Sequence, residues 1–171
     1  MTEPAVVAEE GFAELSARAE AHNVSPVTLL ATDYLNHFNE VLMLLEMLPM
    51  APDCAADVRD WAPKSYERHF AESGFTDKEF VIRAYAAAPP DYRDPFDMTI
   101  EALNGQIAAA VDECCGLAED GADETVLAMA VESHLPHLRA TAERASALIH
   151  GYLEPDVAAD DAQSAIDALF D

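Results

Sequence analysis

The stretch FDMTIEALNGQIAAAVDECCGL, from Phe96 to Leu117, decides the fold class of this chain. Its apolar side chains recur every three or four residues, as they do in a helix with one buried face. These side chains belong to Phe96, Ile100, Leu103, Ile107, Val111 and Cys114. Asp94 can cap such a helix, Pro95 suits its first turn and Gly116 can close it. The pattern therefore predicts an amphipathic helix from Pro95 to Leu117.

Helical patterns also occupy the rest of the chain. A strong helix is expected from Pro26 to Leu48, and its apolar side chains on more than one side are typical of a central bundle helix. Asp123 can cap another long helix that runs to about Ile149 and contains Pro136. Shorter helices are expected over 9–21, 60–70 and 76–88.

No alternating apolar runs bounded by turn residues are found, so no sheet is expected. We predict an all-α fold, an antiparallel helical bundle of about four main helices plus short helices. The bundle domain is expected to span residues 1–151. Residues 152–171 carry six acidic side chains and no basic one, and are expected to form an acidic linker and a C-terminal amphipathic peptide.

Composition narrows the classes of partner. The chain has 171 residues, 51% of them hydrophobic, and a net charge of −24, so we expect a folded acidic domain. Nucleic acid and anionic membrane surfaces are disfavoured as partners because both attract basic patches. Three cysteines without metal-ligand spacing predict reduced thiols in a cytoplasmic protein. Oligomeric state stays open, a homo-oligomer included.

A polar row runs beside the apolar stripe of the quoted stretch. Asp97, Glu101 and Asn104 are spaced four and three residues apart, which places them on one helical face. Gln106 lies on the opposite flank. These side chains are either the solvent-exposed polar residues of an ordinary amphipathic helix or carboxylate and amide groups of a catalytic site.

The end of the chain resembles a known peptide. The segment QSAIDALF, residues 163–170, is similar to the short acidic helix with which FliM and the CheZ phosphatases bind CheY-type response regulators. The matching positions are Gln163, Ile166, Asp167, Leu169 and Phe170. The resemblance implies a CheY-type regulator as the protein partner, bound helix-in-groove.

The polar row adds a second resemblance. Leu103 to Ile107 is similar to the catalytic segment of CheZ around its Gln, although Ala102 stands where CheZ has an acidic residue. The spacing of Asp97, Glu101 and Asn104 fits that of the CheC and CheX phosphatases. The resemblance implies that Glu101 would engage the regulator's lysine and that Asn104, or alternatively Gln106, would orient the attacking water. The resemblance implies no cofactor bound by this chain itself, because the regulator supplies Mg²⁺.

Histidines offer an alternative class of site. His37 and His134 fall on apolar stripes of the two long helices flanking the quoted stretch, and His137 follows one turn after His134. They could gather a metal in a bundle core, or they could be structural histidines bonded to carboxylates. Three interpretations therefore stay open: a regulator-binding phosphatase, a metal- or cofactor-binding bundle, and a non-catalytic interaction bundle.

Overall fold

The structure, a computed structural model, describes residues 3–153. Within this range the chain forms α-helices and short 3₁₀ helices and no strand, which confirms the predicted all-α fold. The α-helices are α1 (Glu3–Arg18), α2 (Asn36–Met47), α3 (Ala55–Asp60), α4 (Tyr66–Glu72), α5 (Lys78–Ala86), α6 (Pro90–Glu119) and α7 (Glu124–Ile149). The 3₁₀ helices are η1 (Glu20–His22), η2 (Thr32–Leu35) and η3 (Pro52–Cys54).

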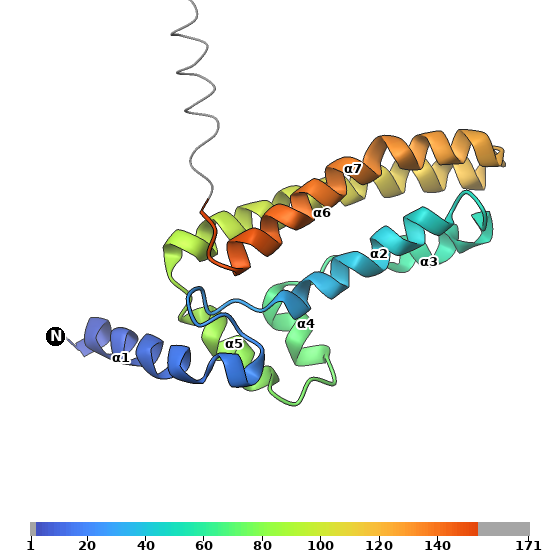
Figure 1. Cartoon of the computed structure of the whole chain (residues 1–171). Helices are drawn as coiled ribbons and strands as arrows, with labels where there is room; N and C mark the ends of the chain where they lie inside the picture. Colours follow the sequence, from blue (N-terminus) through green and yellow to red (C-terminus); the bar gives the residue numbers. More distant parts are fainter. Residues whose placement is uncertain (1–2, 154–171) are drawn as a thin grey trace, which may run out of the picture.

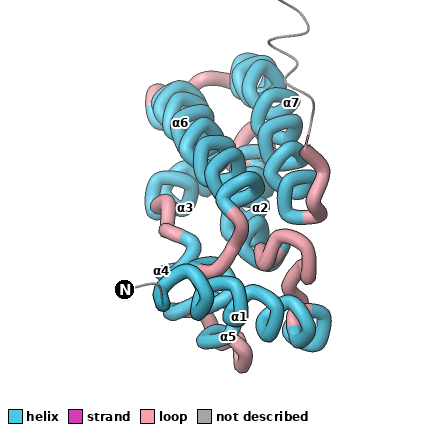
Figure 2. The backbone as a smooth tube through the Cα atoms, turned by 90° about the vertical axis from the view of Figure 1, so that its left-hand side faces the viewer, coloured by secondary structure: helices cyan, strands magenta, loops and turns pink. Residues whose placement is uncertain are grey.

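Two long helices organise the molecule. α6 and α7 run side by side in opposite directions, and α2 and α3 lie along this pair (Figure 1). α1, α4 and α5 gather at the end where α6 begins, as the view along the pair also shows (Figure 2). Gly121, at φ 79°, lies in the tight turn between α6 and α7, and Asp123 caps α7 by accepting a hydrogen bond from the Val126 amide at 2.9 Å.

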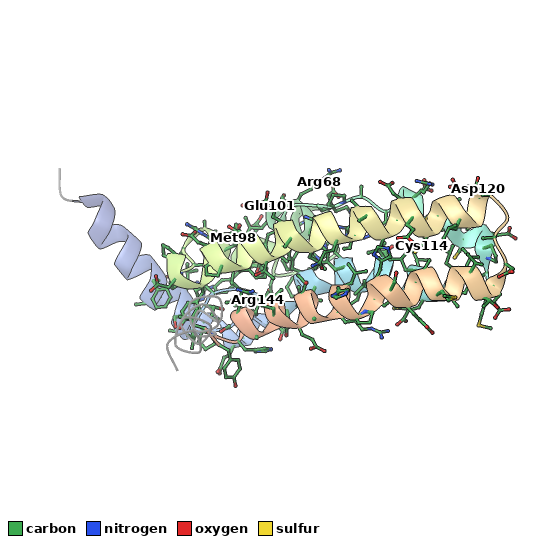
Figure 3. All side chains as sticks on the ribbon, turned by 90° about the horizontal axis from the view of Figure 1, so that it is seen from above. Arg68, Met98, Glu101, Cys114, Asp120 and Arg144 are labelled. Carbon is green, nitrogen blue, oxygen red and sulfur yellow. The ribbon has the colours of Figure 1, made fainter. Side chains whose placement is uncertain are left out.

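The predicted apolar stripe of α6 forms one wall of the core. Leu103, Ile107 and Cys114 are fully buried, together with side chains of α2 and α7 that include Phe38 and Leu138. Figure 3 shows Cys114 between the two long helices. All three cysteines are free thiols, as predicted, and burial raises the pKa of Cys114 to about 11.

The predicted start of α6 at Pro95 is wrong, because the helix already begins at Pro90. Pro90 suits the first helical turn, where a backbone N–H has no partner within the helix. Pro95 lies inside the helix and removes the bond to the carbonyl of Asp91, an exposed residue near the helix start that water can reach. The Thr99 hydroxyl donates to the Pro95 carbonyl at 2.7 Å.

The predicted helix from Pro26 to Leu48 is wrong at its start, over residues 26–31. Residues 25–31 form a compact turn in which Leu29 adopts the left-handed conformation (φ 58°), and helical structure begins only at Thr32. The buried Thr28 hydroxyl donates to the carbonyl of Ile149 at 2.6 Å. This bond to the end of α7 fixes the turn, so tertiary contact outweighs the local helical pattern.

The predicted helix over 60–70 is also wrong at its start. Residues 61–65 are non-helical, and α4 begins at Tyr66 with Ser65 as its cap, the Ser65 hydroxyl accepting from the Arg68 amide at 3.1 Å. The Trp61 side chain donates to the carbonyl of His37 at 2.8 Å, which holds this extended segment against α2.

Candidate functional site

The polar row of α6 lines a surface depression of about 320 Å³. Asp97, Glu101 and Asn104 form one side of it, as their spacing predicted. The opposite side comes from η2, from the segment before α4, and from α4 and α5. The residues lining that side include Tyr34, Lys64, Ser65, Tyr66, Glu67 and Tyr85.

Three tyrosines give the depression an ordered wall. The rings of Tyr66 and Tyr85 stack with their centroids 4.4 Å apart, and the Tyr34 ring lies 5.0 Å from that of Tyr66. The Tyr66 hydroxyl accepts from the Ala31 amide at 2.9 Å, and the Tyr34 hydroxyl donates to the Lys64 carbonyl at 2.6 Å. These bonds join residues 31–34 to residues 64–66, so the wall is held in place before any ligand arrives.

The tyrosines stay protonated. Burial raises the pKa of Tyr34, Tyr66 and Tyr85 well above the ordinary value, and the charge of Asp97 adds to the effect for Tyr34 and Tyr85. The Tyr85 hydroxyl donates to Oδ1 of Asp97 at 2.7 Å. Asp97 lies at the exposed edge of the depression, where partial desolvation raises the pKa of its carboxyl against the opposing effect of the Tyr85 bond.

Glu101 and Asn104 are the two residues of the row without a tyrosine partner. Glu101 is exposed, and the view down on α6 shows it on the edge of that helix away from α7 (Figure 3). Asn104 is half-buried, and its Oδ1 is buried with no hydrogen-bond partner. A buried amide oxygen without a partner is uncommon in folded proteins.

Gln106 does not share this site. It lies on the other flank of α6, outside the lining of the depression, and its Oε1 is also buried without a partner. The structure therefore brings Glu101 and Asn104 together and separates both from Gln106.

Lys64 is a site residue that the sequence interpretation missed. Its Nζ lies 3.0 Å from a carboxylate oxygen of Glu72, whose other oxygen accepts from Arg68 at 2.8 Å. The hydrogen bonds from Arg68 and Lys64 hold the pKa of Glu72 below its usual range. The clustering of six of the nine basic residues between Arg59 and Arg93 was the only sequence signal for a cation here.

The three candidate metal histidines have separate surroundings. His37 is buried and stacks on Trp61 at 4.6 Å, whereas His134 pairs with Glu113 at 2.6 Å and His137 is exposed. Glu46, near the C-terminal end of α2, pairs with Arg139 of α7, whereas His37 lies near the N-terminal end of α2. His134 precedes Arg139 on α7, which runs antiparallel to α2, so His134 lies past the C-terminal end of α2 and away from His37. In the described part of the chain, no group of three or more His, Cys, Asp or Glu side chains is arranged to hold a metal.

His37 has a different neighbour, His69, at 5.7 Å between ring centroids. The Nε2 of His37 is buried without a hydrogen-bond partner. Burial, followed by the nearby His69 and Lys64, lowers the pKa of His37; burial and Lys64 lower that of His69. Both rings therefore favour the neutral form.

The predicted partner-binding residues Gln163, Ile166, Asp167, Leu169 and Phe170 lie outside the described residues. Among residues 3–153, no helix combines the length and the apolar character that crossing a membrane requires.

Comparison with known proteins identifies no relative of this chain. The chain has no significant match among models of protein families, among curated proteins or among solved structures.

Proposed function

We propose that this protein binds a CheY-type response regulator through its C-terminal peptide and accelerates loss of the regulator's phosphoryl group. One observation carries the catalytic part of the proposal. Glu101 and Asn104 line the same depression, and the buried amide oxygen of Asn104 has no partner within the protein. The sequence resemblance of residues 163–170 carries the binding part.

The chemistry needs few groups from this chain. A response regulator holds its phosphoaspartate beside Mg²⁺ and a lysine, so the phosphatase has only to orient a water molecule and engage that lysine. The Asn104 amide would hold the water in line with phosphorus, and the Glu101 carboxylate would pair with the lysine. Water then forms the new P–O bond, the bond to the aspartate breaks, and inorganic phosphate and a free aspartate carboxylate result.

The remaining parts of the proposal concern architecture and location. We assign α2, α3, α6 and α7 as the antiparallel bundle, with the acidic residues 152–171 as the linker and peptide that reach the regulator. The cytoplasm is the compartment that fits, because response regulators act there. The net charge of −24 favours a partner groove edged by lysines.

A binding titration tests the first step. The full chain and a variant lacking Asp160–Asp171 are titrated against a CheY-type regulator from the same organism, with and without beryllofluoride activation. We expect the full chain to prefer the activated regulator and the shortened variant to lose at least about tenfold in affinity. Leu169→Ala and Phe170→Ala should reproduce this loss, whereas Asp171→Asn should not.

The two alternatives give different results. Binding without any change in phosphate release would assign the chain as a non-catalytic interaction protein. No binding in either activation state would contradict the proposal, and a stoichiometric metal in untagged protein would then favour a metal-binding bundle around its histidines.

A further inference from the structure

The outer face of α2 is an exposed row of methionines and polar residues. Met43 and Met47 are 61% and 52% exposed, and Met50, just past the helix, is 84% exposed. The residues of this outer face share one helical side and are Asn36, Asn39, Glu40, Met43, Glu46 and Met47. Nothing in the described part of the chain covers them, although the sequence pattern had predicted a central helix here.

A groove runs along each side of this face. One, of about 520 Å³, separates α2 from α7 and is lined by Asn39, Met43 and Ala142 among others. The second, of about 680 Å³, separates α2 from α3 and contains Met47 and Trp61. Asn39 and Met43 line both grooves, so the two form one continuous surface with a methionine ridge along its middle.

The rim of this surface is acidic. Five carboxylates and one arginine line the two grooves: Glu40, Glu46, Asp57, Asp60, Glu143 and Arg139. Arg139 is already paired with Glu46. A ligand that enters the grooves therefore contacts flexible, apolar methionine side chains flanked by a net negative charge.

We propose that the α2 face binds a basic amphipathic helix of a partner protein. Apolar side chains of such a helix would lie against Met43, Met47 and Trp61, and its Lys or Arg side chains would reach the carboxylates of the rim. The twelve residues of α2 span about 18 Å, which matches roughly three turns of a docked helix. A second copy of this chain fits poorly, because it would bring a net charge of −24 against the same acidic rim.

This site is independent of the proposed regulator binding. It shares no lining residue with the depression at Glu101 and Asn104. Failure of either proposal therefore leaves the other standing.

Methionine-methyl NMR on the full chain tests the inference. The chain has six methionines: Met1, Met43 and Met47 on the α2 face, Met50 just past the end of α2, Met98 and Met129. The probe is a synthetic Leu/Lys amphipathic peptide of about 15 residues, and its control is a peptide of the same composition scrambled to remove the apolar face. We expect the methyl signals of Met43, Met47 and Met50 to shift with the amphipathic peptide, and those of Met98 and Met129 to stay in place.

Matched variants measure the affinity. Met43→Gln/Met47→Gln should weaken peptide binding by about tenfold at physiological salt, because it removes the apolar ridge. Met98→Gln/Met129→Gln changes two methionines that are 71% and 68% exposed elsewhere and should alter affinity by less than about twofold. All four substitutions are at exposed positions, so unchanged thermal unfolding of both variants checks that the fold is intact.

Three results would overturn the inference. Equal binding of the scrambled peptide would reduce the effect to bulk charge. Shifts of the α2 methionine signals with protein concentration alone would show that a second copy covers the face. A change of the same signals on deletion of residues 154–171 would show that the chain's own tail occupies it.

Discussion

The Tyr85 hydroxyl donates a 2.7 Å hydrogen bond to Oδ1 of Asp97, and this bond ties α5 to the polar row of α6. Tyr85 also stacks on Tyr66, whose hydroxyl accepts from the Ala31 amide. One side chain thus connects the first residue of the row to the tyrosine wall opposite. The connection joins the two sides of the depression that Glu101 and Asn104 line.

Removing the Tyr85 hydroxyl should change the titration of Asp97. In Tyr85→Phe the carboxylate loses the hydrogen bond that favours its charged form, while partial desolvation stays. We expect the pKa of Asp97 to rise further above its ordinary value, as measured by NMR of the carboxyl carbon. Tyr34→Phe is the control, because that hydroxyl bonds to the Lys64 carbonyl. An equal response of Asp97 to both substitutions would contradict the assigned partner.

Thr28 should be a stability hot spot despite its position in a turn. Its fully buried hydroxyl donates to the Ile149 carbonyl at 2.6 Å and accepts from the Leu30 amide at 3.2 Å. Thr28→Val keeps the shape and leaves both backbone groups without a partner, so unfolding free energy should fall by about 1–3 kcal/mol in urea titrations. Thr141→Val removes a bond within α7 to the His137 carbonyl and should cost less than about 0.5 kcal/mol. Equal losses would mean that the Thr28 bond does not fix the turn.

Acidification should destabilise the protein through His37 and His69. The folded-state pKa of both is lowered, so below the unfolded-state pKa of about 6.5 the unfolded chain binds more protons than the native one. Above pH about 6.5 the two neutral rings make their full contribution to the free energy of unfolding. This contribution declines as the pH falls below that value and levels off below the lowered folded-state pKa. Urea unfolding from pH about 7.5 to about 5 measures the decline. His37→Phe, which keeps a ring against Trp61, should flatten the curve, and adding His69→Phe should flatten it further. An unchanged curve in the double variant would exclude these histidines as its cause.

The sequence pattern correctly predicted helical features that depend only on residues close together in the chain. The stripe through Leu103, Ile107 and Cys114 is buried as its spacing indicated, and Asp123 caps α7. The turn at 25–31 was missed because the contact that fixes it, Thr28 with Ile149, joins residues 121 positions apart. No short stretch of sequence contains both Thr28 and Ile149, so a local pattern could not predict their contact.

The site was predictable on one side only. The helical period alone placed Asp97, Glu101 and Asn104 on one face, and all three line the depression. The opposite wall was not predictable, because Tyr34, Lys64 and Tyr85 belong to three different segments that meet only in the fold. The separation of Gln106 from Asn104 followed from their spacing and agrees with the lining of the depression.

The most direct test of the central claim is phosphate release from a phosphorylated CheY-type regulator in the presence of this protein. The wild-type chain should accelerate release, and Asn104→Ala and Glu101→Gln should each lower that acceleration by about a hundredfold. Gln106→Ala, a change on the same helix outside the depression, should leave it within about twofold. An absence of acceleration by the wild-type chain, or a loss caused by Gln106→Ala and not by Asn104→Ala, would contradict the account.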